Sequence, residues 1–208
     1  MPINYLAKLM ISKVTRLDLF LFFNSLLFLM MCIFFYFDRF TMFHGRANIH
    51  EFFFYAAVIF FVIFCVWLKF RKIDVPYYIL VLTELTILIH FSGAFVEVDG
   101  RRLYEFRLFS VRYDKFVHCI NSLIGSFVLL YLFVKNNYKI GKFICMITIF
   151  SVLGIGAIIE ILEFIITLTV DNNGVGTYTN NMLDLVANII GSTIGIGCYL
   201  FYKKPDLK

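Results

Sequence analysis

The sequence predicts an all-α polytopic membrane protein, and its composition and apolar runs are the observations that support this. Of the 208 residues, 61% are hydrophobic and only 16% are charged, and the mean hydropathy is +0.86. Soluble domains are usually about 45–50% apolar and about 25% charged. A soluble core from a chain of this length cannot bury so much apolar surface, and disorder requires low hydrophobicity with high charge. A water-soluble globular enzyme and a disordered chain are therefore both excluded.

Six apolar runs are long enough to cross the bilayer as helices, which takes roughly 20 residues for a hydrocarbon core of about 30 Å. The runs are continuously apolar and lack the alternation of transmembrane barrel strands, so only helices fit. The first run is also too long for a signal peptide, so we expect it to be retained. We expect one domain over residues 1–208 with spans at about 17–37, 52–70, 75–95, 116–134, 143–169 and 182–202.

The distribution of Lys and Arg predicts the orientation of these six helices. The N-terminus, the second and fourth loops and the C-terminal tail share one side and carry twelve Lys and Arg, against seven on the other side. The positive-inside rule then places both termini in the cytoplasm of a multi-pass plasma (inner) membrane protein. Because the basic residues lie in short clusters between apolar runs, we expect membrane lipid as a partner and no nucleic acid.

The third loop, at about residues 96–115, is then the largest external feature. It holds five basic residues and four acidic neighbours, so we expect a solvated loop whose charges pair with one another. The alternative is that the basic residues meet lipid headgroups or a phosphate. The five are Arg101, Arg102, Arg107, Arg112 and Lys115.

Ionisable residues inside the spans are the candidate functional groups, because each costs at least a few kcal/mol in a bilayer. In the expected topology, four helices bring such residues to a similar depth on the external side. The main candidates are His118, Glu160, Glu163 and Asp184, with His90, Asp114, Asn181 and Asn188 as supporting residues. Within the last three helices the polar positions recur every three or four residues, which places them on one helical face. We therefore expect a polar pocket between these helices, open to the outside, with His90 at its rim.

Two kinds of chemistry fit these residue types. The imidazoles and carboxylates suffice for one divalent metal, bound by His118, Glu163 and Asp184, or for a histidine–carboxylate pair in general acid/base catalysis. The alternative is a structural network in which the polar groups only satisfy one another. The sequence has no GxSxG, P-loop, glycine-rich dinucleotide turn or HExxH motif.

Four sequence blocks together resemble the YjdF-like bacterial inner-membrane proteins of unknown function. The blocks are IHFSGAF with His90, RYDKFVHCINSLIG with His118, EILEF with Glu160 and Glu163, and NNMLDLVANIIGSTIG with Asp184. The last three also resemble the wider VanZ-like group, whose name comes from glycopeptide (teicoplanin) resistance. The resemblance covers roughly residues 75–200 and implies a role in the cell envelope, but it supplies no reaction. After His90 this chain has AFVEVDGRRLYEF, where the family tends to have a tyrosine-rich segment.

Three functions remain open from the sequence. The first is an envelope membrane enzyme that hydrolyses or transfers a group on a lipid-linked or headgroup substrate. His118 would be base or ligand, Glu160 and Glu163 acid/base groups or ligands, and Asp184 the orienting carboxylate. The second is a small proton-coupled transporter, and the third is an accessory or lipid-binding membrane protein. Transporters usually show internal repeats and helices broken in mid-membrane, and this sequence shows neither, so the enzyme ranks first.

Overall fold

The computed structural model describes residues 14–169 and 177–203, and helices dominate these two stretches. Five helices are long and apolar enough to cross a membrane, and a shorter apolar stretch, Tyr77–Gly93, forms most of a sixth. The five are Arg16–Met42, Ile49–Phe70, Tyr113–Lys135, Lys142–Ile165 and Tyr178–Tyr202. The expected all-α polytopic membrane fold is therefore confirmed.

Contacts divide the chain into two compact units, residues 1–80 and residues 81–208. Each unit has its own packing and is described separately. The expected single domain stays a prediction.

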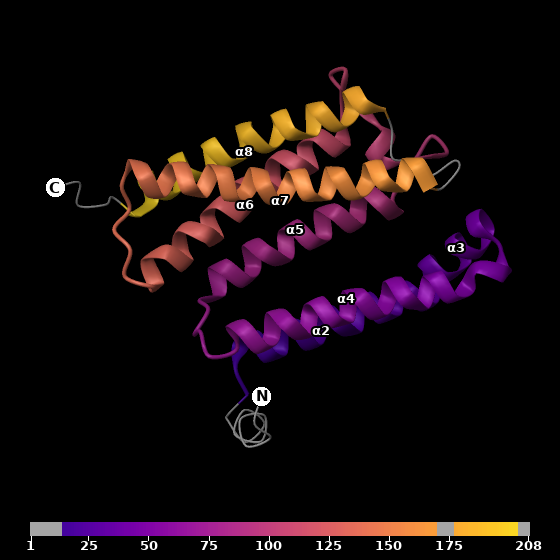
Figure 1. The fold of residues 1–208 in the computed structure, drawn as a ribbon, viewed down its shortest axis with the longest axis horizontal. Helices are drawn as coiled ribbons and strands as arrows, with labels where there is room; N and C mark the ends of the chain where they lie inside the picture. The colour runs from indigo at the N-terminus through magenta and orange to yellow at the C-terminus, as the bar shows by residue number, and fades with distance from the viewer. Residues whose placement is uncertain (1–13, 170–176, 204–208) are drawn as a thin grey trace. The chain divides into compact units, whose positions relative to one another are not determined.

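The first unit is built on two long antiparallel helices that lie side by side (Figure 1). Its elements are α2 (Arg16–Met31), the π-helical turn η1 (Cys32–Tyr36), α3 (Phe37–His44), the 3₁₀ turn η2 (Arg46–Asn48) and α4 (Ile49–Phe70). Because α2, η1 and α3 follow one another without a break, the helix expected at 17–37 continues to His44. Gly45 then ends it with a φ of 76°, a conformation that glycine adopts without strain.

A polar cluster joins the beginning of α2 to the end of α4. Asp18 and Thr15 form a capping box, in which the Thr15 hydroxyl accepts from the Asp18 backbone N–H and the Asp18 carboxylate accepts from that of Thr15. The same carboxylate accepts from Trp67 Nε1 at 2.6 Å and from Arg71 Nε at 3.0 Å. The Arg71 side chain is only 7% exposed, so this loop charge is buried against Asp18.

The second unit contains three long helices that pack on one another, together with most of α5 (Figure 1). The helices are α5 (Tyr77–Phe95), α6 (Tyr113–Lys135), α7 (Lys142–Thr169) and α8 (Tyr178–Lys203). Their bounds lie close to the expected spans, but α8 begins four residues earlier than predicted. The Thr177 hydroxyl accepts the Asn180 backbone N–H at 3.4 Å and so caps this extra turn, which carries Asn180 and Asn181 into the helix.

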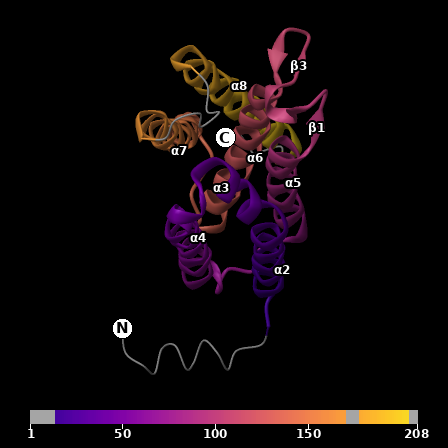
Figure 2. The ribbon, with the colours of Figure 1, turned by 90° about the vertical axis from the view of Figure 1, so that its right-hand side faces the viewer.

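The segment between α5 and α6 forms two short β-hairpins joined by a 3₁₀ turn. The elements are β1 (Glu97–Val98), β2 (Arg101–Arg102), η3 (Leu103–Glu105), β3 (Arg107–Leu108) and β4 (Val111–Arg112). Figure 2 shows the hairpins next to each other, beside the ends of α5 and α6. The expected pairing of loop charges is present for Arg102, which donates to Glu105 at 2.8 Å.

Close approach of α6 and α8 organises the second unit. A Cβ atom at Gly191 would overlap the backbone carbonyl of Cys119, and one at Gly195 would overlap that of Leu123. Small residues spaced by four allow membrane helices to approach in this way. At the far end of the same pair, the Tyr199 ring is 1% exposed and packs against the Phe127 ring with centroids 5.0 Å apart. The backbone contact therefore fixes which side chains of α6 and α8 face each other.

Candidate functional site

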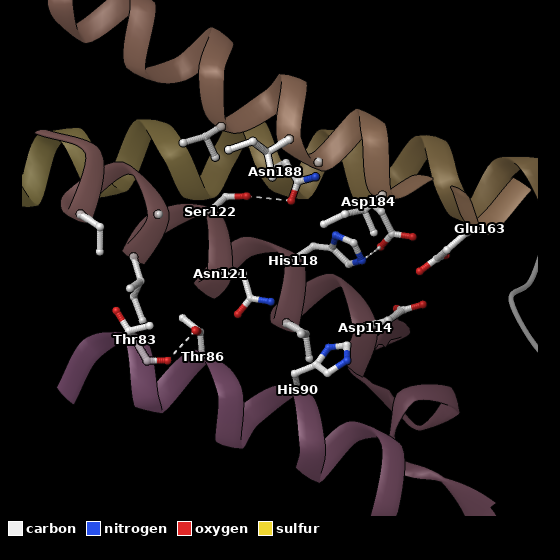
Figure 3. Close-up of a pocket in the computed structure, with 18 of the residues that line it drawn as sticks. Thr83, Thr86, His90, Asp114, His118, Asn121, Ser122, Glu163, Asp184 and Asn188 are labelled. Carbon is white, nitrogen blue, oxygen red and sulfur yellow. Dashed lines mark hydrogen bonds and ion pairs between the residues drawn. The ribbon is translucent and has the colours of Figure 1, made fainter. Parts of the chain in front are cut away.

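A cluster of His118, Glu160 and Asp184 forms where α6, α7 and α8 meet, and one ligand atom from each lies within 4.8 Å of the others. His118 Nε2 lies 3.6 Å from Asp184 Oδ1 and 3.7 Å from Glu160 Oε1. Glu160 is 4% exposed and Asp184 only 1%. Figure 3 shows the imidazole facing Asp184 across the helix interface. The expected proximity of these residues on three different helices is thus present in the fold.

Lys115 supplies a buried positive charge to this cluster. Its Nζ donates to Asp184 Oδ1 at 2.7 Å and to Asn180 Oδ1 at 2.9 Å, and it lies 3.3 Å from Asp114 Oδ2. The expectation of a solvated loop lysine is wrong, because α6 begins at Tyr113 and Lys115 is 9% exposed. A spacing of three residues places Lys115 on the same helical face as His118, and this is the signal that could have identified it.

Asn180 and Arg112 complete the polar shell around the two aspartates. Asn180 Nδ2 donates to Asp184 Oδ2 at 3.1 Å, and its Oδ1 also accepts from Arg112 Nη1 at 2.8 Å. Arg112 Nε lies 3.3 Å from Asp114 Oδ2. The sequence had indicated Asn181 as a supporting residue. Asn181 is buried, but it is Asn180 that contacts the cluster, since it lies one helical turn before Asp184 on the same face.

Asn188 continues the polar face of α8 away from Asp184. The Ser122 hydroxyl, one turn after His118 on α6, donates to Asn188 Oδ1 at 2.7 Å, and both side chains are buried (Figure 3). Gly156 of α7 leaves room for this amide, because a Cβ there would overlap Asn188 Nδ2. Ser122, Gly156 and Asn188 therefore hold the three helices in register beneath the cluster.

A pocket of about 710 Å³ lies beside the cluster and is lined by α5, α6, α7, α8 and the hairpin segment. Ionisable side chains gather at one end, where Figure 3 shows His90, Asp114, His118, Glu163 and Asp184. Arg102 and Arg112 also line the pocket. The deeper lining is mainly apolar: Ile124, Val128, Leu129, Leu132, Val152 and Ile155. On α6 the lining extends from Asp114 to Leu132, a rise of about 27 Å along the helix.

His90 lines the same pocket from α5, and its expected place at the rim stays a prediction. Its Nδ1 and backbone carbonyl lie 2.6 Å and 3.0 Å from the hydroxyl of Tyr104. The Tyr104 ring lies over Gly93, where a Cβ would be 2.7 Å from the ring. The sequence pattern did not identify Tyr104 as a site residue, although it is the one tyrosine of the stretch AFVEVDGRRLYEF.

The two glutamates of α7 have different surroundings. Glu163 lines the pocket, whereas Glu160 reaches His118 and Asp184. Within the part of the chain that the structure describes, both carboxylate oxygens of Glu160 are buried without a hydrogen-bond partner. The metal ligands expected from the sequence were His118, Glu163 and Asp184, but the geometric cluster has Glu160 in place of Glu163.

The fold and this cluster define a polytopic membrane protein that buries a histidine, acidic groups and a lysine between its last three helices. The chain belongs to the DUF2238 family, described as "predicted membrane protein", whose model matches residues 20–205. The resemblance to YjdF-like proteins is consistent with this family, and the relation to the VanZ-like group stays a prediction. No curated protein and no solved structure matches the chain.

Proposed function

We propose that this protein is an envelope membrane enzyme that acts on the polar headgroup of a lipid or lipid-linked substrate. The observation that supports this is the division of the pocket into an ionisable end and a long apolar lining. A lipid has the same division, since its headgroup is polar and its chains are apolar. The rise of about 27 Å between Asp114 and Leu132 is enough for a long chain.

At the ionisable end, His118 is the proposed catalytic base, because imidazole accepts protons near neutral pH. It lines the pocket beside Glu163 and Asp184. Asp184 is positioned by hydrogen bonds from Lys115 and Asn180 and orients the imidazole from 3.6 Å. With this support, His118 removes a proton from a water or hydroxyl nucleophile, and Glu163 acts as the acid/base partner facing the headgroup.

The membrane setting is part of the proposal. The excess of Lys and Arg on one side supports a plasma (inner) membrane location with both termini cytoplasmic and the ionisable end of the pocket outside. Membrane lipid is then the partner, and the substrate enters from the outer leaflet. The buried charges also argue for function rather than packing, because ionisable groups in a membrane are costly.

A proton-coupled transporter is the second candidate, and the pocket lining argues against it. A transport path needs polar groups at successive depths of the membrane. Below Asn121 and Ser122 the described pocket lining on α6, Ile124 to Leu132, contains no ionisable residue. A lipid-binding accessory protein would use the same pocket without turnover, and the experiment below distinguishes it.

The test is to incubate the purified protein with vesicles of a bacterial total polar lipid extract and to follow headgroup release or transfer by mass spectrometry. Wild type is expected to convert one lipid class, and His118→Gln and Asp184→Asn are expected to lose at least 100-fold of that rate. His50→Gln, in the exposed start of α4, is the matched control and should keep the rate. If lipid co-purifies with the protein but no lipid is converted, the enzymatic function is refuted and the protein is a lipid-binding accessory protein.

A further inference from the structure

We propose that His118, Glu160 and Asp184 bind one divalent transition-metal ion, of the zinc or manganese class, at the ionisable end of the pocket. The inference deepens the proposed function and changes one role in it: with the ion bound beside the headgroup end, His118 and Asp184 are its ligands, and Glu163 is the base. Its test does not depend on that function. It assigns Glu160, which lies outside the pocket lining, a role as a metal ligand.

The distances are close to those of a metal site. His118 Nε2 lies 3.6 Å from Asp184 Oδ1 and 3.7 Å from Glu160 Oε1, and all three ligand atoms fit within 4.8 Å. Zinc binds nitrogen and carboxylate oxygen at about 2.0–2.2 Å, which sets its ligands about 3–3.5 Å apart. A movement of about 1 Å by the Glu160 side chain closes the set.

Glu160 is the observation that points to a ligand rather than to an acidic cluster alone. Its side chain is 96% buried, and in the described residues neither carboxylate oxygen accepts a hydrogen bond. Buried polar groups nearly always have partners, because an unpaired one is costly. The nearest polar group to Glu160 Oε1 in the cluster is His118 Nε2, at a distance that a bridging ion would shorten.

The net charge of the groups around the cluster favours the binding of a divalent cation. Four carboxylates surround it, those of Asp114, Glu160, Glu163 and Asp184. Two permanently charged groups, Arg112 and Lys115, form ion pairs with Asp114 and Asp184. With the four carboxylates ionised and the imidazole neutral, these seven groups sum to two negative charges, which one divalent ion neutralises.

Hydrogen bonds from neighbouring side chains position the Asp184 carboxylate and still leave it able to bind a metal ion. Lys115 and Asn180 each occupy one lone pair of Asp184, so that a further lone pair on Oδ1 faces His118. Such hydrogen bonds orient metal ligands in proteins. One imidazole with two carboxylates suits zinc, manganese or iron better than calcium or magnesium. Three protein ligands leave a coordination position open, as catalytic metal sites do.

The experiment measures metal binding in the absence of lipid. Chelator-treated protein in detergent is equilibrated with ZnCl₂ or MnCl₂ and freed of excess metal, and bound metal is counted by mass spectrometry. Wild type should retain about one ion per chain and unfold at a higher temperature with metal. His118→Gln and Glu160→Gln should bind at least 10-fold more weakly and lose this shift, while His50→Gln should behave as wild type.

Glu163→Gln separates the two glutamates, because this residue lines the pocket one turn away from the cluster. It should retain the ion. Loss of the ion in Glu163→Gln with retention in Glu160→Gln would overturn the assignment. Wild type that binds no more metal than the two ligand variants would also overturn it, and would indicate a protonated Glu160 instead.

The variants remain informative even if their stability falls. Manganese bound to wild type is also followed by its EPR signal, which equimolar zinc should displace. Absence of a bound-manganese signal together with no retained zinc refutes the site without any substitution. Metal binding without lipid turnover would refute only the proposed enzymatic function. Lipid turnover by chelator-treated protein would refute only the proposed metal site.

Discussion

Lys115 Nζ lies 2.7 Å from Asp184 Oδ1, with both side chains buried between the first turn of α6 and the second turn of α8. The pair links two helices, and its two residues are 69 positions apart in the chain. Removing one member of a buried ion pair typically costs about 3–5 kcal/mol, because it leaves an uncompensated charge, whereas replacing both members is often neutral. The pair is therefore a test of how the charges of the cluster are balanced.

We expect Lys115→Met to lower the free energy of unfolding of the second unit by about 3 kcal/mol, since it leaves the buried Asp184 carboxylate without its lysine partner, while Asp114 keeps Arg112. Adding Asp184→Asn should recover a large part of this loss, because the second charge is then removed as well. Thermal unfolding in detergent measures both effects. Lys142→Met, at the exposed start of α7, is the control. Equal stability of Lys115→Met and wild type would show that the pair is not structural.

Glu163→Gln separates a functional pocket from a structural network. If the pocket is catalytic, this variant should lose lipid conversion by at least 10-fold while the protein still inserts and stays folded, because the amide keeps the size but cannot exchange a proton. If the network is only structural, the amide should be tolerated or stabilising, since a buried charge is costly. Conversion rate and unfolding temperature are measured together. Unchanged values of both would defeat the catalytic role.

The close approach of α6 and α8 predicts a marked difference between two glycines of α8. Gly191→Ala places a methyl group against the Cys119 carbonyl, so the helices must separate, at a cost of about 1–3 kcal/mol. Gly197→Ala is the matched control, because no atom lies within 4 Å of its added Cβ, and it should be neutral or stabilise the helix. The comparison is made by thermal unfolding in detergent. Similar unfolding temperatures for the two variants would contradict the observed packing.

The helices could be predicted from the sequence because a bilayer admits few other structures for long apolar runs. The same constraint made His118, Glu160 and Asp184 recognisable, since an ionisable residue in a span is unusual. Lys115 and Asn180 were not identified as members of the cluster, because they lie at the ends of the apolar runs and not inside them. Both lie in the first turn of a helix, where an apolar-run boundary cannot decide whether a polar side chain points to solvent or into the bundle.

The sequence alone also could not decide which of Glu160 and Glu163 lies next to His118. The two residues are separated by less than one turn of α7, so both lie near the polar face. Which one reaches His118 depends on how α7 is rotated against α6 and α8, and the sequence pattern does not specify that rotation. Tyr104 depends likewise on the path of the hairpin segment, which brings its hydroxyl to His90.

Asp18 offers a test within the first unit. Asp18→Asn should lower the unfolding temperature, because the Arg71 guanidinium is buried and would lose its carboxylate partner. The loss is expected to be about 3 kcal/mol, at the lower end for a broken buried pair. Asp38→Asn in α3 is the control, since it is the backbone carbonyl of Asp38 that accepts the Thr41 hydroxyl. A tolerated Asp18→Asn would show that the capping box and Trp67 hold α2 without the charge.

The proposed orientation leads to the last prediction, because it decides which leaflet the pocket faces. Reporter fusions at the C-terminus and between α6 and α7 near Tyr138 should both report the cytoplasm, and an insertion at Gly100 should report the opposite side. Gly100 lies at the tip of the β1–β2 hairpin, where an insertion disturbs no helix. The physical reason is the excess of Lys and Arg in the N-terminus, second loop, fourth loop and C-terminal tail. Compared with a further fusion after Asp74, in the loop between α4 and α5, the insertion also tests α5, whose 19 residues span about 28 Å, close to the thickness of the hydrocarbon core. If Gly100 reports the same side as the C-terminus, the three helices α6, α7 and α8 do not all cross the membrane, and the headgroup end of the pocket cannot face the outer leaflet. If Gly100 reports the same side as the fusion after Asp74, α5 does not cross it.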